Sequence, residues 1–270
     1  MKPHFDFYAD VLKELLHNGQ LTLDSSILVV CGGPSDKDTL QSVGFRSVTV
    51  SNVDERLLGS PDGQFAPYLW MYENAEGLTP RDDSFDICIV HSGLHHCHSP
   101  HKAISEMYRV ARNGILMFEP HESWFTKLGA RLGVGQTYET WAVWGNGLRW
   151  GGVANTAIPN FVYRFSAGEI RKVIAAMQPE YLPCIRFWYR TRANLDFPNA
   201  AAPVRLLARL VRPALLLLGK IAPFCANNFA AFVTKPGSGT PLQPWLRKEA
   251  GRIFPDDDYF RKIYGPVKPD

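Results

Sequence analysis

The feature that most constrains the fold is a series of short apolar runs that alternate with segments of helical spacing. Residues 27–31 form a β-branched run, a helical pattern ends at Gly44, and residues 46–54 give a second strand. The run 84–90 is almost continuously apolar, as in a strand buried on both faces. This alternation predicts an α/β fold: a Rossmann-like, doubly wound and mostly parallel sheet with helices on both faces. Functional residues should therefore follow strands, because ligands of such sheets bind at the carboxyl ends.

The same alternation continues up to residue 120. A short strand is expected near Tyr68–Tyr72, and a helix should begin with the Ser99–Pro100 pair and run to about Arg112. The Asn113–Gly114 pair then predicts a turn into the apolar strand 115–120.

The remainder of the chain is less regular. Residues 121–165 are rich in Trp, Tyr and Gly and too long for a simple connection, so we interpret them as a lid or substrate-facing insertion. Ser166 and Glu169 form a capping box at the start of a helix. Two late strands, within 181–190 and 227–235, should pair antiparallel and close one edge of the sheet.

We expect one domain over residues 1–236 and an extended C-terminal arm over 237–270, ordered only where its aromatic residues dock. Within the domain, 203–224 is an apolar helical segment that its arginines and Pro213 interrupt, so it should not cross a membrane. Three roles remain open for it: packing on the domain, a homodimer contact, or peripheral contact with a membrane.

Composition narrows the partners and the compartment. The formal net charge of +3 is too weak a bias to indicate a nucleic-acid-binding protein. The five cysteines form no CxxC pair, which is typical of reduced, cytoplasmic proteins, and the N-terminus does not resemble a secretory signal.

Four segments, "ILVVCGGPSD", "SVTVSNVDE", "NAEGLTPRDDSFDICIVHSGLHH" and "EMYRVARNGILMFEP", carry a family resemblance. In order and spacing they resemble the class I S-adenosylmethionine-dependent methyltransferases, in particular the small-molecule group that includes the ubiquinone-biosynthesis type (methyltransferase type 11). The resemblance is good over residues 25–120, faint up to 236 and absent beyond. It implies a methyltransferase whose cofactor is S-adenosylmethionine.

The first loop departs from the family pattern acid-x-Gly-x-Gly-x-Gly, because Val29 and Ser35 stand where the acid and the third glycine are usual. Gly32 and Gly33 are expected to supply φ freedom and a close backbone approach to a ligand. The departure argues against a pyrophosphate-binding loop, so the loop is expected to hold the methionine end of the cofactor.

The ribose and adenine contacts follow the next two strands. The family's ribose-binding acid falls on Asn52, with Asp54 two residues later, and which of the two binds the hydroxyls stays open. Asn74 stands at the acidic position of the adenine loop, where a plain turn is the alternative. The expected cofactor-binding residues are Cys31, Gly32, Gly33, Ser35, Asn52, Val53, Asp54, Asn74, Ala75, Glu76, His91 and Ser92.

The histidine-rich run 91–101 invites a metal hypothesis, but its spacing fits no standard zinc pattern and no second Cys/His cluster completes it. We therefore expect no metal. The "GLHH" stretch matches the family's Leu-His-His, which lies beside the methyl group. Methyl transfer to a hydroxyl needs a base, and we assign His95, with His96 as its substitute and His121 or Glu122 as the orienting partner.

The expected reaction is O-methylation of a small-molecule or glycan hydroxyl. The alternative is C- or O-methylation of a quinone-like or polyketide ring at a membrane surface. The tryptophans of the insertion suit either kind of acceptor. They could equally form the core of a small subdomain. A hypothesis from another class is a non-catalytic binding or scaffold protein, which the acids missing at Val29, Asn52 and Asn74 favour.

Overall fold

A computed structural model describes residues 3–57, 63–131, 136–192, 202–222 and 225–266. Its centre is a seven-stranded sheet in the order β3-β2-β1-β4-β5-β7-β6. The strands are β1 (Ile27–Val30), β2 (Val48–Asn52), β3 (Leu69–Tyr72), β4 (Phe85–His91), β5 (Ala111–Pro120), β6 (Cys184–Arg190) and β7 (Asn228–Thr234). The helices are α1 (Pro3–His17), α2 (Pro34–Val43), α3 (Pro100–Val110), α4 (Trp124–Arg131), α5 (Thr140–Gly145), α6 (Ala167–Met177), α7 (Ala202–Ile221) and α8 (Asp257–Tyr264).

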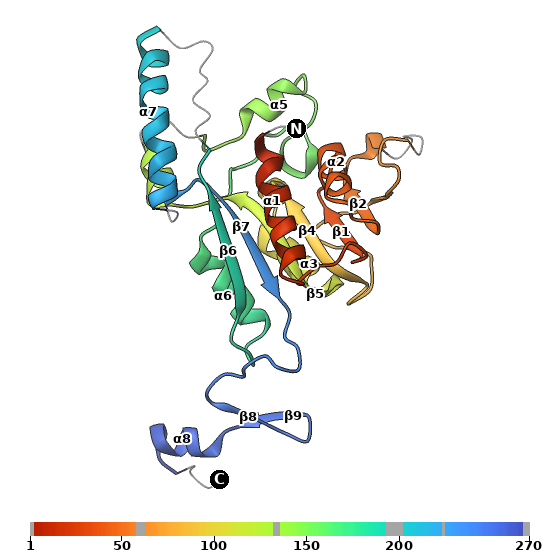
Figure 1. Ribbon diagram of the computed structural model, residues 1–270, viewed down its shortest axis with the longest axis vertical. Coiled ribbons are helices and arrows are strands. Elements are labelled where there is room, and N and C mark those ends of the chain that lie inside the picture. Colours follow the sequence, from red (N-terminus) through yellow and green to blue (C-terminus); the bar gives the residue numbers. More distant parts are fainter. Residues whose placement is uncertain (1–2, 58–62, 132–135, 193–201, 223–224, 267–270) are drawn as a thin grey trace.

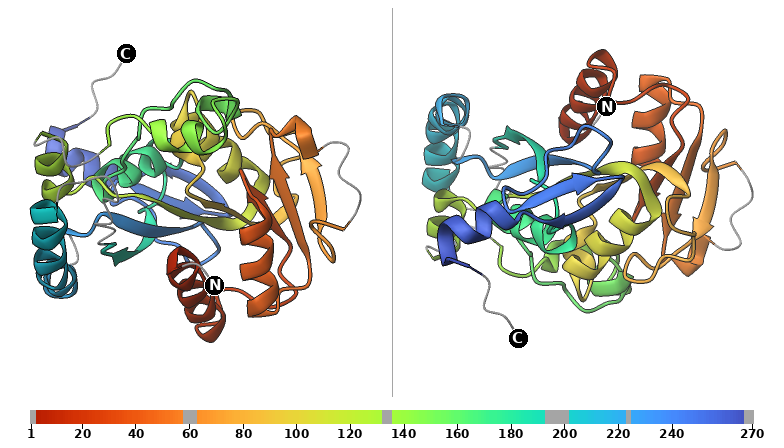
Figure 2. Two further views of the ribbon diagram at one scale, coloured as in Figure 1. Left: turned by 90° about the horizontal axis from the view of Figure 1, so that it is seen from above. Right: turned by 90° about the horizontal axis from the view of Figure 1, so that it is seen from below.

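The sheet confirms the expected doubly wound topology. Strands β3, β2, β1, β4 and β5 run parallel, and β7 lies antiparallel between β5 and β6. Helices α1 and α2 cover one face, and α3 and α6 cover the other (Figures 1 and 2).

Alternation along each strand builds a core on each face. In β1, Ile27 and Val29 join the cluster under α1 and α2, whereas Leu28 and Val30 join the cluster under α3 and α6. All four side chains are buried, which is why this strand reads as a continuous apolar run.

The helix ends agree with the sequence. Gly44 closes α2 in a left-handed conformation, and Ser166 and Glu169 form the predicted capping box of α6. Ser99 precedes α3 as expected, but its side chain does not cap the helix. Glu76 fixes the segment before the helix, because its carboxylate accepts hydrogen bonds from the backbone N–H groups of His98 and Ser99.

The predicted turn at Asn113–Gly114 was wrong, because both residues lie inside β5. Gly114 has φ 157°, and a Cβ there would stand 2.1 Å from the backbone oxygen of Val233 in β7. The glycine therefore permits close strand pairing rather than a reversal of the chain.

The C-terminal segment projects away from the sheet (Figure 1), but it is not a simple extended arm. Strands β8 (Leu246–Glu249) and β9 (Arg252–Pro255) form an antiparallel hairpin, and α8 follows with Asp256 as its N-cap. Aromatic contacts link Trp245 to Tyr259 and Tyr259 to Phe260, so the segment packs partly on itself. Residues 267–270 of the predicted arm lie outside the described residues.

Helix α7 confirms the helical character of 203–224 up to Ile221, and residues 223–224 lie outside the described part. Within the described ranges, no helix has the length and apolarity that a bilayer crossing requires.

A buried carboxyl lies at the start of α2. The Asp36 side chain accepts a hydrogen bond from the Gly33 N–H (2.9 Å), but its Oδ1 has no hydrogen-bond partner among the described residues. Burial raises the pKa of Asp36 to about 7, although the backbone N–H groups of Gly33 and Asp36 oppose the rise.

We predict that Asp36→Asn removes part of the pH dependence of stability. Between the unfolded pKa of about 4 and the folded pKa of about 7 the native state holds a proton that the unfolded chain lacks, so wild-type stability falls as pH rises through this window. Asn keeps an acceptor for the Gly33 N–H without a charge. The variant should gain about 2–3 kcal/mol relative to wild type between pH 5 and pH 8, measured by urea unfolding. An equal stability difference at both pH values would contradict this account.

Candidate active site

A cleft of about 750 Å³, including its open mouth, lies at the carboxyl ends of β1, β2, β3 and β4, as the topology predicts. One wall comes from the loops that follow these strands, and the other comes from residues 151–155 of the insertion. The lining residues are Cys31, Asn52, Val53, Asn74, Ala75, Glu76, Ser92, Gly93, His96, Cys97, Gly151, Gly152, Ala154 and Asn155.

Two neighbouring loops enter the cleft in strained conformations. Cys31 after β1 and Ser92 after β4 both have φ 55°, a left-handed conformation that costs a non-glycine residue about 1–3 kcal/mol. Gly93 lets these loops touch, because a Cβ there would stand 2.5 Å from Cys31 Cβ. Such strain is typical of ligand sites, and both residues line the cleft.

Gly32 and Gly33 do not supply the φ freedom that the sequence predicted for them. Gly33 has an extended backbone (φ −141°), and the left-handed residue of the loop is Cys31. A Cβ on Gly32 would stand 2.7 and 2.8 Å from side-chain carbons of Val29 and Val50, so this glycine is needed for packing against β1 and β2.

The loop after β2 is held by its own polar groups. Asn52 Nδ2 donates to the Gly32 carbonyl (2.8 Å), and Asn52 Oδ1 accepts from the Asp54 N–H (3.1 Å). Asp54 is paired with Arg56, whose hydrogen bond and charge lower the pKa of the carboxyl. The Arg56 guanidinium in turn lies 3.8 Å over the ring of Trp150, which ties the insertion to this edge of the cleft.

The loop after β3 forms a side-chain turn, because Asn74 Oδ1 accepts a hydrogen bond from the Glu76 N–H (2.9 Å). The amide oxygen keeps a second lone pair, and Asn74 and Ala75 both line the cleft.

Five of the predicted cofactor residues do not line the cleft: Gly32, Gly33, Ser35, Asp54 and His91. The His91 ring stacks on Tyr8 of α1 with centroids 5.2 Å apart, and its Nδ1 lies 4.0 Å from Asp36 Oδ1. His91 therefore belongs to the core beneath the cleft, because it points to the α1 face of β4.

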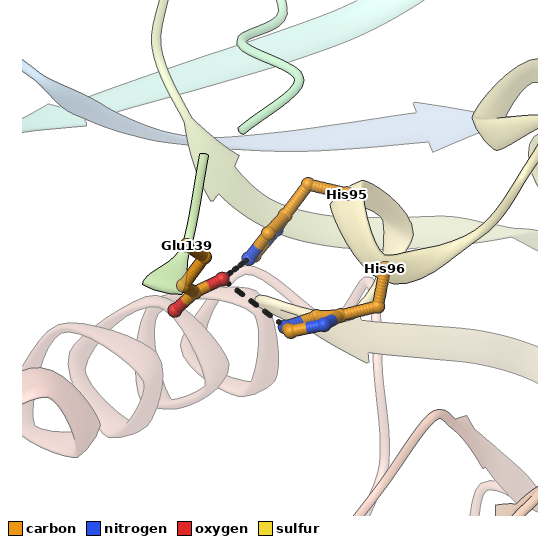
Figure 3. Close-up of side chains that lie close together, drawn as sticks. All are labelled: His95, His96 and Glu139. Carbon is orange, nitrogen blue, oxygen red and sulfur yellow. Dashed lines mark ion pairs between the residues drawn. The ribbon is translucent and has the colours of Figure 1, made fainter. Parts of the chain in front are cut away.

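A cluster of ionisable side chains lies at the cleft. His95 and His96 lie on the short 3-10 turn η2 (Leu94–His96), and Glu139 reaches both from the insertion (Figure 3). Glu139 Oε2 lies 3.3 Å from His95 Nε2 and 3.4 Å from His96 Nε2.

Glu119 at the end of β5 fixes the turn from below. Its buried carboxylate accepts from the backbone N–H groups of Gly93 and Leu94 (2.9 and 2.8 Å) and lies 2.7 Å from His95 Nδ1. Both ring nitrogens of His95 thus face carboxylate oxygens. Burial alone would lower the pKa of His95, but the charge and hydrogen bond of Glu119 and then of Glu139 raise it to about 10. His95 is consequently a cation at neutral pH.

His96, in contrast, is neutral at pH 7. Burial and then the charge of His95 lower its pKa, which outweighs the attraction of Glu139. Its Nδ1 lies 3.3 Å from the Gly152 carbonyl and its Nε2 lies 3.4 Å from Glu139 Oε2, so the neutral ring donates its one hydrogen to one of these oxygens and turns its lone pair to the other. His96 lines the cleft, whereas His95 does not.

The predicted orienting partners were wrong. His121 Nδ1 donates to the Ala226 carbonyl (2.8 Å) and its ring packs on Tyr189, while Glu122 pairs with Lys127 at 3.2 Å. Glu119 lies two residues after Met117 in β5, so both side chains are on the face of the sheet that α3 covers. The strand thereby places Glu119 beside His95 before it ends at Pro120.

Sequence reasoning missed Glu139 and Asn160. Two paired segments of the insertion place them, since Tyr138 bridges Phe161 and the Glu139 N–H donates to the Asn160 carbonyl. Asn160 Nδ2 then donates to the His95 carbonyl (3.0 Å) and to Glu139 Oε2 (3.3 Å). No local motif marks these residues, because only the tertiary fold brings them to the histidines.

Comparisons with known proteins agree with this geometry. Residues 31–118 match the family described as "Methyltransferase domain". The solved magnesium protoporphyrin IX methyltransferase of Synechocystis PCC 6803, which contains S-adenosylhomocysteine, is 13% identical, with TM-score 0.52 and coverage of 86% of this chain and 84% of that one. A SAM-dependent methyltransferase of Archaeoglobus fulgidus is 11% identical, with TM-score 0.47 and coverage of 84% and 94%. A search of curated protein sequences found no significant match.

The family match spans the first loop, the cleft residues after β1 to β4 and β5 up to Phe118. The likeness to the Synechocystis structure supports the fold of the whole sheet. Residues 31–118 therefore belong to the methyltransferase domain family, and the seven-stranded sheet has the fold of a class I S-adenosylmethionine-dependent methyltransferase.

Proposed function

We propose that this enzyme methylates a hydroxyl group of a small molecule or glycan, and that His96 removes the hydroxyl proton. The observation that carries the proposal is the position of His96: it lines the cofactor cleft and is fixed at Gly152, beside the carboxylate of Glu139. In the reaction the acceptor oxygen takes the methyl group while its proton passes to His96 Nε2.

The cleft offers polar groups that suit the cofactor, which supplies an electrophilic methyl group when bound. We propose that the strained backbone at Cys31 and Ser92 binds the methionine end and that Asn52, rather than Asp54, binds the ribose, because Asn52 lines the cleft. Asn74 and Ala75 would hold the adenine. The five cysteines are free thiols, which supports a cytoplasmic location.

His96 suits the role of base better than His95, which the sequence favoured. A base must arrive without a proton, and the two carboxylates that face His95 hold a proton on each of its nitrogens. We propose that His95 is a positioning residue, because its charge orients Glu139 and lowers the pKa of His96.

The insertion exposes aromatic rings that suit a ring-shaped acceptor. Trp141 and Trp144 are more than 60% exposed and lie 4.7 Å apart between ring centroids, so they are not the core of a small subdomain. Aromatic faces pack on sugars and on aromatic rings alike. This favours a glycan or an aromatic acceptor over an aliphatic one.

Filling the cleft should prevent cofactor binding. Val53→Trp places a large ring at the cleft wall, so calorimetry with S-adenosylhomocysteine should show binding to the wild type and none to the variant. Leu69→Trp is the matched control, since Leu69 is exposed on β3 and does not line the cleft. Equal affinities of the Val53 variant and the wild type would place the cofactor elsewhere.

Loss of His96 should impair chemistry rather than cofactor binding. With the best acceptor from a panel of glycosides and phenols, His96→Ala should lower turnover by ~10²–10⁴-fold, measured as transfer of a radiolabelled methyl group. His98→Ala is the control, because His98 is exposed in the same histidine run. Wild-type turnover in the His96 variant would mean that alignment alone drives the transfer.

A second acceptor class is favoured by the surface of α7. Leu206, Leu210, Leu217 and Ile221 form an exposed stripe along this helix, Arg212 is exposed as well, and the sequence of the helix also contains Arg205 and Arg209. Exposed leucines with basic residues suit an anionic membrane surface, where a quinone-like or polyketide ring would be methylated. A homodimer would cover the same stripe.

The membrane proposal predicts that the protein sediments with vesicles that contain anionic phospholipid, and that the Leu210→Glu/Leu217→Glu variant does not. Leu69→Glu at the opposite edge of the sheet is the control. Should the wild type stay in the supernatant and elute as a dimer that the double variant dissociates, the stripe is a dimer contact instead.

A further inference from the structure

The cluster of His95, His96 and Glu139 has the dimensions of a metal site. One ligand atom of each residue lies within 4.8 Å of the other two, and the two measured separations from Glu139 Oε2 are 3.3 and 3.4 Å (Figure 3). In a tetrahedral zinc site with bonds of about 2.1 Å, neighbouring ligand atoms lie about 3.4 Å apart. The side chains could thus close on an ion with small shifts.

The surroundings of the cluster also match those of a metal site. Histidines that bind metals usually donate their other ring N–H to a carboxylate or a carbonyl, which aims the free nitrogen at the ion. Here His95 Nδ1 is held by Glu119 at 2.7 Å and His96 Nδ1 by the Gly152 carbonyl at 3.3 Å. Asn160 Nδ2 lies 3.3 Å from Glu139 Oε2, so the third side chain is oriented as well.

The metal-free cluster leaves one contact unfavourable. His96 has an oxygen that only accepts hydrogen bonds near each ring nitrogen, the Gly152 carbonyl and Glu139 Oε2. A neutral ring carries one hydrogen, so its remaining lone pair faces an oxygen. A cation between His96 Nε2 and Glu139 would turn this repulsion into two bonds.

We propose that His95, His96 and Glu139 bind a divalent transition-metal ion, with zinc as the best fit to two imidazoles and one carboxylate. The ion replaces the proton between His95 Nε2 and Glu139, and that proton leaves to solvent. The site was not expected from the sequence, because its third ligand lies in the insertion, 43 residues beyond His96.

Zinc bound here inhibits methyl transfer. The inhibition rests on the proposed function, since the lone pair of His96 cannot serve the ion and the acceptor's proton at once. Binding of the ion does not rest on it. The metal site and the base are therefore tested separately, one by binding without cofactor or acceptor and the other by turnover.

The binding test uses the full chain after treatment with EDTA and its removal, titrated with zinc against a chromogenic chelator. Wild type and the control variant His98→Gln should bind one zinc at this site, and His96→Gln and Glu139→Gln should each weaken it by at least ~10²-fold while melting as wild type does. Absence of zinc binding to the wild type, or wild-type affinity in both variants, would overturn the proposal.

Cobalt substitution identifies the ligands. Cobalt bound to nitrogen and oxygen ligands should show visible d–d bands without a strong thiolate band in the near-ultraviolet. Such a thiolate band would place the ion on the nearby Cys31 or Cys97 and overturn the assignment. In the turnover test, zinc should lower the rate and EDTA should restore it, and a rate that rises with zinc would overturn the inhibitory role.

Discussion

The buried carboxylate of Glu119 is the interaction on which the rest of the site depends. It ends β5, fixes the turn between β4 and α3 through the N–H groups of Gly93 and Leu94, and holds the ring of His95. A carboxylate buried this deeply is stable only because all these donors converge on it. Removing it would free the turn that carries His95 and His96 and expose three unsatisfied donors.

Glu139 extends this arrangement to the insertion. The positive charge that Glu119 stabilises on His95 attracts Glu139, whose pKa falls to about 2 because of its hydrogen bond with His95. The insertion is thereby fixed over the cleft at two places, here and where Trp150 packs under Arg56. The positive charge of His95 also lowers the pKa of His96, so His95 is a cation and its neighbour is neutral.

The sheet and most helix ends were predictable because their signals are local: buried apolar runs, the Gly44 stop and the Ser166–Glu169 capping box. The cleft loops were located correctly because parallel strands bring their carboxyl ends together. The roles of single residues were harder. Cys31 adopts the left-handed conformation assigned to the glycines, and Asp36 is buried although it looks like a helix-surface residue. Contacts with Glu139 and Asn160 depend on how a long insertion folds back, which no short-range pattern encodes.

The division of charge between the two histidines is the central claim, and nitrogen NMR of metal-free protein with ¹⁵N-labelled histidine tests it most directly. At pH 7, the account predicts hydrogens on both ring nitrogens of His95 and a neutral His96 with a hydrogen on only one ring nitrogen. A neutral His95, or a His96 that carries hydrogens on both nitrogens at pH 7, would contradict it.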